Sequence, residues 1–116
     1  MITPALLLSL REPYFSLVAK KIKTVEGRLY KESYKLLKVN DIIRFTNEES
    51  PKKHLDVKVV SVRKYPTFKE MLNSELEKCL PGVESVERGI EIFHSFPAYA
   101  ENENTLGAIA IEIELQ

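Results

Sequence analysis

The stretch KTVEGRLY at residues 23–30 alternates from Thr24 to Tyr30, with Thr24, Glu26, Arg28 and Tyr30 on one side, which is the pattern of a β-strand with one polar face. Glu26 and Arg28 are two residues apart and project from the same side of this strand, while Lys23 lies where a preceding helix would end. Such a group can grip an anion or accept hydrogen bonds from a base or sugar, and it can equally form surface ion pairs. The spacing alone leaves both interpretations open.

The residues before this stretch predict a strand and a helix. Residues 5–10 form an apolar run, which indicates a central strand covered on both faces. Pro13 suits a first helical turn because no N–H is needed there, and apolar residues then recur at helical spacing. A helix is therefore expected over about 12–21.

The residues after it predict two further strands. Val-Asn-Asp at 39–41 indicates a turn that leads into a strand at 42–45. A polar loop then precedes a long strand at about 55–64. The apolar residues of this strand change parity between Val59 and Val60, so we expect a bulge or a bend there.

The C-terminal half predicts two helices and a closing strand. Thr67 begins a Thr-x-x-Glu capping box, and the helix that follows is expected to end at Pro81. Ser85 is a second N-cap, for a helix that ends before Pro97. Residues 108–115 alternate isoleucine or leucine with alanine or glutamate, which is typical of a strand with one exposed face.

These elements predict an α+β fold in one domain that spans residues 1–116. We expect about five to six strands in a small, partly closed β-barrel, flanked by two or three short helices. A five-stranded open sheet with helices on one face is the alternative architecture.

The charge balance excludes a protein that coats nucleic acid by charge alone, because 17 basic and 17 acidic side chains give a formal net charge of zero. The charges are unevenly divided, however. Residues 11–64 carry 14 basic and 7 acidic side chains, whereas residues 65–116 carry 3 and 10. This asymmetry indicates either a basic face that meets an anion or charges spread over a solvated surface.

The composition also bears on location and cofactors. Cys79 is the only cysteine, so no intrachain disulfide can form, and a reducing, cytoplasmic location is expected. The two histidines lie in no zinc-ligand spacing, so neither a metal nor another cofactor is expected. The apolar run at 5–10 is too short to cross a bilayer, so we expect no membrane partner, and a monomer is assumed.

Three stretches resemble the ASCH domain family, a relative of the PUA domain: EPYF at 12–15, KTVEGRLY at 23–30 and LKVNDIIRF at 37–45. The family signature G-x-K-x-x-E-x-R, followed by a Gly-Asp turn and a strand, aligns with residues 21–28. Shorter matches near residues 67, 80 and 107–113 extend the resemblance over nearly the whole chain.

The resemblance implies a PUA-like β-barrel with a cleft beside it, into which Lys23, Glu26 and Arg28 would point. It also implies a protein that binds RNA or a nucleotide-like small molecule. Arg44 and Tyr99 are further candidates for this cleft, because a tyrosine can stack on a base. One branch of the family hydrolyses N4-acylated cytidines, so a small amidohydrolase is the alternative function, ranked below a binding module.

This sequence departs from the family pattern at three positions. Lys21 and Asn40 stand where the family has glycine, so both turns must form without it, at a cost of about 1 kcal/mol for a left-handed lysine. The hydrolase branch places a threonine nucleophile three residues after the signature lysine, where this chain has Glu26. Thr24 is the only nearby threonine, and its offset from the lysine is wrong for that branch.

Overall fold

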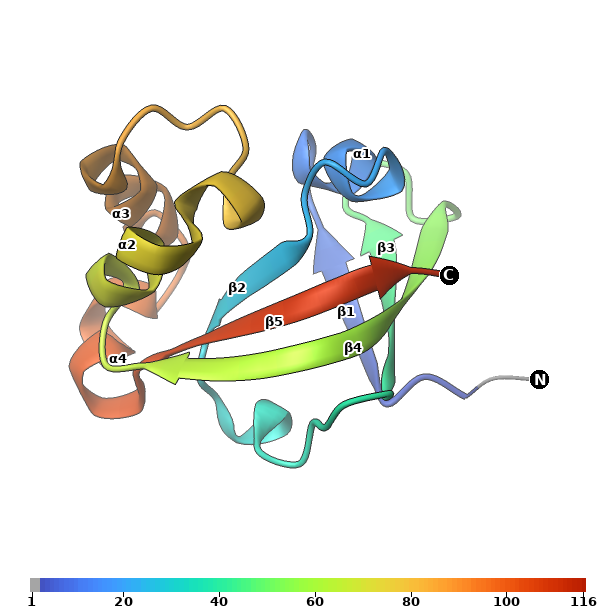
Figure 1. Ribbon diagram of the computed structural model, residues 1–116, viewed down its shortest axis with the longest axis horizontal. Helices are drawn as coiled ribbons and strands as arrows, with labels where there is room; N and C mark the ends of the chain where they lie inside the picture. The colour runs from blue at the N-terminus through green and yellow to red at the C-terminus, as the bar shows by residue number, and fades with distance from the viewer. Residues whose placement is uncertain (1–2) are drawn as a thin grey trace.

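The computed structural model describes residues 3–116 and contains a single five-stranded sheet in the order β1-β3-β4-β5-β2. The sheet curls on itself into a half-barrel, with α2, α3 and α4 gathered on one side and α1 over one end (Figure 1). The strands are β1 (Leu6–Leu10), β2 (Val25–Leu29), β3 (Ile42–Asn47), β4 (His54–Tyr65) and β5 (Ala108–Leu115). The helices are α1 (Tyr14–Ala19), α2 (Phe68–Cys79), α3 (Val86–His94) and α4 (Tyr99–Leu106), with a 3-10 turn η1 (Glu32–Tyr34).

The predicted α+β architecture is confirmed, and the first and last strands belong to one sheet. β1 pairs with β3 in parallel, and every other pairing is antiparallel. The parity change in the long strand is also confirmed as a bulge: the register of β4 against β5 shifts between Val59 and Ser61. The extra residue bends β4 and allows the sheet to curl.

Two apolar cores lie on the two faces of this sheet. The concave face encloses side chains from the strands, from α1 and from Tyr34 of η1. On the opposite face, α2, α3 and α4 cover β2 and the first half of β5. Gly27 permits this close approach, because a Cβ there would stand 2.8 Å from both Met71 Cε and Phe93 Cζ.

The predicted helix boundaries rest on caps that the structure contains. The Thr67 hydroxyl accepts a hydrogen bond from the Glu70 N–H at 3.2 Å, and the Ser85 hydroxyl accepts one from the Arg88 N–H at 3.1 Å. Lys21 and Asn40 have φ values of 63° and 77°, so both turns take the left-handed conformation without glycine. The left-handed Lys21 lets the Ile22 N–H reach the Leu17 carbonyl oxygen at 2.9 Å, which closes α1.

Three expectations about the elements were wrong. β1 is an edge strand, because its unpaired side faces β2, and Leu7 is 70% exposed. β5 has no exposed face over its first four residues, because Ala108 and Ala110 pack beneath the helices while Ile109 and Ile111 face the barrel. Helix α4 was not expected, since its sequence has no apolar periodicity and its N-cap, Ala98, has no capping side chain.

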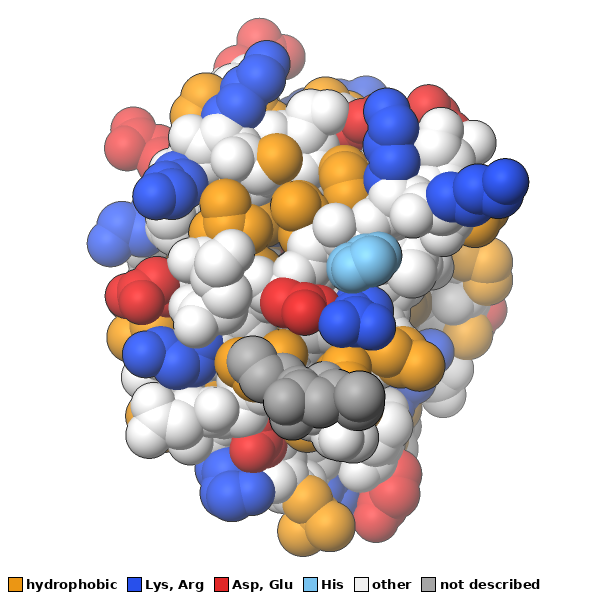
Figure 2. All heavy atoms as spheres, turned by 90° about the vertical axis from the view of Figure 1, so that its right-hand side faces the viewer, with side chains coloured by type: hydrophobic (Ala, Val, Ile, Leu, Met, Phe, Trp, Pro, Cys, Tyr) orange, Lys and Arg blue, Asp and Glu red, His pale blue; other side chains and the backbone are white. Residues whose placement is uncertain are grey.

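Charged groups of both signs are interspersed on the side of the molecule that carries β3 and the start of β4 (Figure 2). Much of the basic excess in residues 11–64 is used in ion pairs, such as Arg44 with Asp56 at 2.7 Å and Arg63 with Glu75 at 2.6 Å. This side therefore offers no continuous basic surface. Within residues 3–116, no helix has the length and apolar character needed to cross a bilayer.

Candidate functional site

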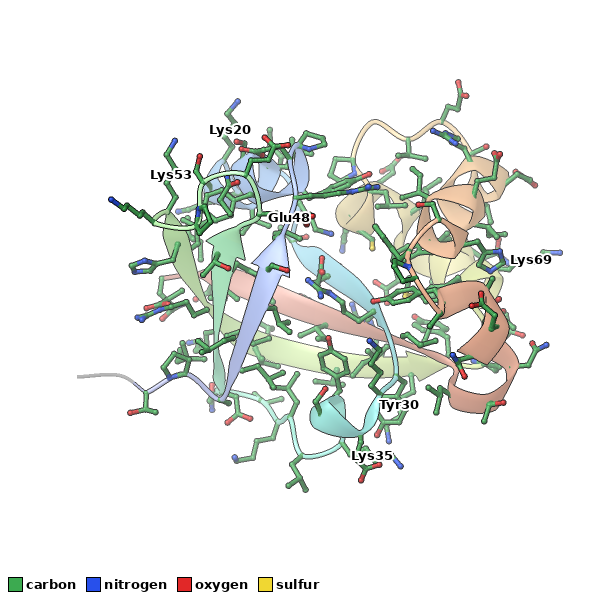
Figure 3. All side chains as sticks on the ribbon, turned by 180° about the vertical axis from the view of Figure 1, so that it is seen from behind. Lys20, Tyr30, Lys35, Glu48, Lys53 and Lys69 are labelled. Atoms are coloured by element: carbon green, nitrogen blue, oxygen red, sulfur yellow. The ribbon has the colours of Figure 1, made fainter. Side chains whose placement is uncertain are left out.

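A cavity of about 550 Å³ lies between the two edge strands of the half-barrel and the α3–α4 segment. The barrel side contributes residues from β1, β2 and the turns that follow them, and the helical side contributes a group of aromatic residues. Seen from behind, β1 and β2 face each other across this region, with Glu48 near the end of β1 (Figure 3). Its lining includes Ser9, Arg11, Lys23, Glu26, Arg28, Lys31, Glu48, Ser95, Phe96 and Tyr99.

Lys23 lies at the floor of the cavity and is almost completely buried, at 3% exposure. Its ammonium group donates to the carbonyl oxygen of Val25 at 2.6 Å and to that of Cys79, and it lies 3.1 Å from Glu26 Oε1. An ammonium group has three N–H donors, and each has an acceptor here. Lys23 is therefore a charged, fully bonded structural cation.

Glu26 connects Lys23 to Arg28. Its second oxygen, Oε2, accepts a short hydrogen bond from Arg28 Nε, and the residue is 5% exposed. Burial raises the pKa of Glu26, but the adjacent charges of Arg28 and Lys23 outweigh this effect, so that its pKa lies below the usual value. The carboxylate is thus ionised, and the buried cluster of two cations and one anion carries one positive charge in excess.

Arg28 is the member of this cluster that faces the cavity most openly, with 18% of its side chain exposed. Nη2 donates to the Ser9 carbonyl oxygen at 2.8 Å, a contact across the gap between β2 and β1. Burial raises the pKa of Tyr34 and Tyr99, which lie close enough to Arg28 for its charge to act on them. Both phenols remain neutral near pH 7, so neither of them compensates the excess positive charge.

Two more cations lie at the rim, and neither was among the predicted site residues. Arg11 stacks on Phe96, with Cζ 4.7 Å from the ring centroid, and Lys31 Nζ lies 5.8 Å from the ring centroid of Tyr99. Glu48 is the carboxylate at the rim. The only signal in the sequence was position, because Arg11 and Lys31 each follow directly after a predicted strand.

The predicted site residues are brought together with one exception. Lys23, Glu26, Arg28 and Tyr99 all line the cavity. Arg44 does not: the alternation along β3 turns it to the outer face of the sheet, where Nε and Nη2 bond to Asp56 at 2.7 and 3.0 Å.

The expected polar face of β2 is not solvated, because this face turns into the cavity floor. Tyr99 is only 8% exposed and stacks on Phe68, with the ring centroids 5.6 Å apart. Its ring therefore forms part of the cavity wall.

The structure offers no activated nucleophile at this site within the described residues. Thr24 is not among the residues that line the cavity. The Ser95 hydroxyl lines it but donates to the Ile92 carbonyl oxygen at 2.6 Å. Cys79 is completely buried, and burial raises the pKa of its thiol to about 11. Within residues 3–116, no group of three His, Cys, Asp or Glu side chains is placed to hold a metal ion.

A second charged cluster, outside the cavity, fixes α2 to the sheet. Arg63 of β4 makes two hydrogen bonds to Glu75 of α2, at 2.6 and 2.9 Å, and a third to Glu112 of β5 at 2.9 Å. The Tyr65 hydroxyl also donates to Glu75 at 2.8 Å. All four side chains are satisfied within the cluster, so its role is structural.

Comparison with known proteins places these features in a family. The model of the ASCH domain matches residues 8–116. The crystal structure of hypothetical protein PH0355 is similar, with a TM-score of 0.82, 38% sequence identity, and coverage of 96% of this chain and 98% of that one. The solution structure of protein PF0455 from Pyrococcus furiosus has a TM-score of 0.72 and 39% identity, and 94% of each chain is covered.

No curated protein matches the chain. The family match nevertheless covers the sheet from Leu8 of β1 onward, all the helices and the whole Lys23–Glu26–Arg28 cluster. The curled five-stranded sheet is the α+β, PUA-like half-barrel that the resemblance implied. The chain belongs to the ASCH domain family.

Proposed function

We propose that the protein binds a nucleotide unit in this cavity, either as part of single-stranded RNA or as a nucleotide-like small molecule. The observation that carries the proposal is the buried Lys23–Glu26–Arg28 cluster, with its one excess positive charge, beneath aromatic walls. A volume of about 550 Å³ is in the range of small-ligand sites. Aromatic walls and a guanidinium group suit an unstacked base and its acceptor atoms.

The contacts of the cluster assign different tasks to its members. Lys23 has no N–H left for a ligand, and both oxygens of Glu26 are engaged by cations. Arg28 lines the cavity and uses Nε and Nη2 in the hydrogen bonds described above, and a guanidinium group has five N–H donors in all. Arg28 is therefore the proposed ligand contact, and Lys23 and Glu26 hold it in position.

The same contacts weigh against the hydrolysis of acylated cytidines. Attack by a hydroxyl group requires a base within hydrogen-bond distance, and the amine of Lys23 is occupied by two carbonyl oxygens and a carboxylate. Binding without chemistry is the function that this geometry supports better.

Fluorescence anisotropy with short, labelled single-stranded RNAs tests the proposal. We expect Arg28→Ala to weaken binding by roughly 1–3 kcal/mol if its guanidinium contacts a base edge in the buried site. Arg44→Ala is the matched control, because it removes the same charge from the outer face. Because the whole chain is neutral, affinity is expected to be modest and to fall as salt rises. Equal binding by both variants, or no binding of RNA or mononucleotide at low salt, would refute the proposal.

A further inference from the structure

The cavity has four cations, two deep (Lys23 and Arg28) and two at the rim (Arg11 and Lys31). The two pairs differ in whether a carboxylate neutralises their charge. Lys23 and Arg28 share Glu26. In the described part of the chain, Arg11 and Lys31 make no ion pair and donate no side-chain hydrogen bond. Each instead lies over an aromatic ring of the α3–α4 segment. The rim cations are therefore free to bind an anion, whereas Lys23 and Arg28 already form ion pairs with Glu26.

The aromatic contacts hold these cations in place without consuming their hydrogen-bonding capacity. A guanidinium group that stacks flat on a ring keeps the N–H donors at its edge, and an ammonium over a ring keeps its donors on the far side. Phe96 is itself fixed by edge contacts with Phe93 and Tyr99, at centroid distances of 6.1 and 5.3 Å. Arg11 thus rests on a rigid support.

The backbone beneath Arg11 is also anchored. The Glu12 carboxylate accepts hydrogen bonds from the Ser16 N–H at 2.9 Å and from Asn47 Nδ2 at 3.2 Å, which ties the start of α1 to the end of β3. The Glu48 N–H donates to the Leu10 carbonyl oxygen at 3.0 Å. Arg11 is therefore preorganised, and such positioning reduces the entropy lost on binding.

The topology places the two rim cations at opposite ends of the cavity. β1 and β2 run antiparallel to each other across the gap, as the strand pairings require. Arg11 follows the last residue of β1 and Lys31 comes shortly after the last residue of β2, so they mark the two ends of the gap. Their side chains lie over two different rings, Arg11 over Phe96 and Lys31 over Tyr99, so each cation has its own support at its end of the gap.

We infer that the cavity binds a segment of single-stranded RNA chain through two phosphate sites, one at Arg11 and one at Lys31, with a base against Arg28 between them. This inference rests on the proposed function and narrows it from any nucleotide-like ligand to a polynucleotide chain. In this arrangement, Arg11 and Lys31 make the ionic contacts with the phosphates. Arg28, held in position by Glu26, contacts the base.

Glu48 is a carboxylate at the rim whose charge opposes this arrangement, so its removal should strengthen binding where removal of a cation weakens it. It lies near the end of β1 (Figure 3) and lines the same end of the cavity as Arg11, without pairing with it. A carboxylate beside a phosphate site repels the phosphate. Glu48→Gln is therefore expected to tighten RNA binding severalfold.

The experiment compares a labelled uridine hexamer with uridine 5′-monophosphate on the full chain, at several salt concentrations. The hexamer is expected to bind at least tenfold more tightly than the mononucleotide. Arg11→Gln and Lys31→Gln should each weaken the hexamer about three- to tenfold, and each should reduce the slope of log K against log salt by about 0.7. Lys69→Gln, an exposed lysine on α2 that points away from the cavity (Figure 3), is the charge-matched control.

Arg11→Lys tests charge and side-chain shape separately, because it keeps the cation and loses the guanidinium contact over Phe96. The Arg11→Lys variant should keep the wild-type slope of log K against log salt. Circular dichroism melts of the variants show whether a loss of binding is a loss of fold.

Failure of this inference is distinguishable from failure of the proposed function. If the mononucleotide binds as tightly as the hexamer, or if Arg11→Gln and Lys31→Gln bind the hexamer with the wild-type salt slope, the two-phosphate site is wrong and the nucleotide-binding proposal stands. Weaker binding of the hexamer by Glu48→Gln would likewise contradict the two-phosphate site. If neither probe binds the wild-type protein, the proposed function itself is wrong.

Discussion

Arg28 donates from Nη2 to the backbone carbonyl oxygen of Ser9 at 2.8 Å, and this hydrogen bond joins the two edge strands of the half-barrel. Because the β-ladder does not pair β1 with β2, a side chain spans the gap that a sixth strand would fill in a closed barrel. The same side chain faces the cavity, so binding and the width of the gap are linked through one residue. Glu26 holds Arg28 in this position.

Loss of the Glu26 charge should destabilise the protein strongly. Glu26→Gln leaves two cations in a site where burial penalises charge, and removal of one partner from a buried ion pair costs about 3–5 kcal/mol. Urea denaturation of the variant should show a much lower midpoint with an unchanged slope. Arg44→Ala, which breaks the half-buried pair with Asp56, should lower the midpoint much less. Equal losses in the two variants would show that the cluster is not a buried charge site.

The stability should fall in acid in a way that Glu26 controls. Its folded-state pKa is lowered, since the opposing effect of burial is outweighed by Arg28 and Lys23. A carboxyl with a lowered pKa contributes stability above its unfolded-state pKa, near 4.3, and loses that contribution as pH falls toward the folded-state value.

The midpoint of urea denaturation, measured from pH 7 to pH 3, should therefore decrease below about pH 4.5. Glu75 has a lowered pKa as well, because Arg63 bonds to it, and it adds to the same trend. In Glu26→Gln the slope with pH should be smaller than in the wild type. An identical pH profile would contradict the assignment to Glu26.

Gly27→Ala should destabilise the contact between the sheet and the helices. The new Cβ would lie 2.8 Å from Met71 Cε and from Phe93 Cζ, and 3.0 Å from Cys79 Sγ. Met71 can move its terminal methyl, but Phe93 is stacked on Phe68 with a centroid distance of 4.5 Å. Overpacking of this kind costs about 1–3 kcal/mol. A thermal melt measures the loss, and an unchanged melting temperature would show that the helices shift without cost.

Lys21→Gly should stabilise the end of α1. Lysine at φ 63° carries a steric penalty that glycine lacks, so the variant should gain up to about 1 kcal/mol. The neighbouring Lys20 has φ −87°, an ordinary value, and provides the control. Lys20→Gly should lose about 0.5–1 kcal/mol through chain entropy. If both variants shift the free energy of unfolding in the same direction, the left-handed residue is not under strain.

Incubation with N4-acetylcytidine should give no turnover above background. Lys23 has no free N–H, and Thr24 does not line the cavity. Chromatographic measurement of released cytidine and acetate checks this expectation. Turnover that disappears in Thr24→Ala, with Arg44→Ala unaffected, would make the hydrolase the leading function.

The sequence by itself determined every feature that depends on near neighbours along the chain. The alternation at residues 24–30 placed Glu26 and Arg28 on one side of a strand, and the parity change at Val59 located the bulge. The caps at Thr67 and Ser85 fixed the starts of α2 and α3. These signals are local because strand alternation and helix capping are set by backbone geometry within a few residues.

Only the tertiary structure decided which strands lie at the edges and which cations remain free. Nothing within residues 5–10 indicates that β1 pairs on one side only, since that depends on the curl of the whole sheet. Arg11 and Lys31 are 20 positions apart and acquire a common cavity only when β1 and β2 face each other. Arg44 is likewise a cation on or next to a predicted strand, but its side chain turns outward toward Asp56. Charge is visible in a sequence, whereas burial and pairing are properties of contacts between distant segments.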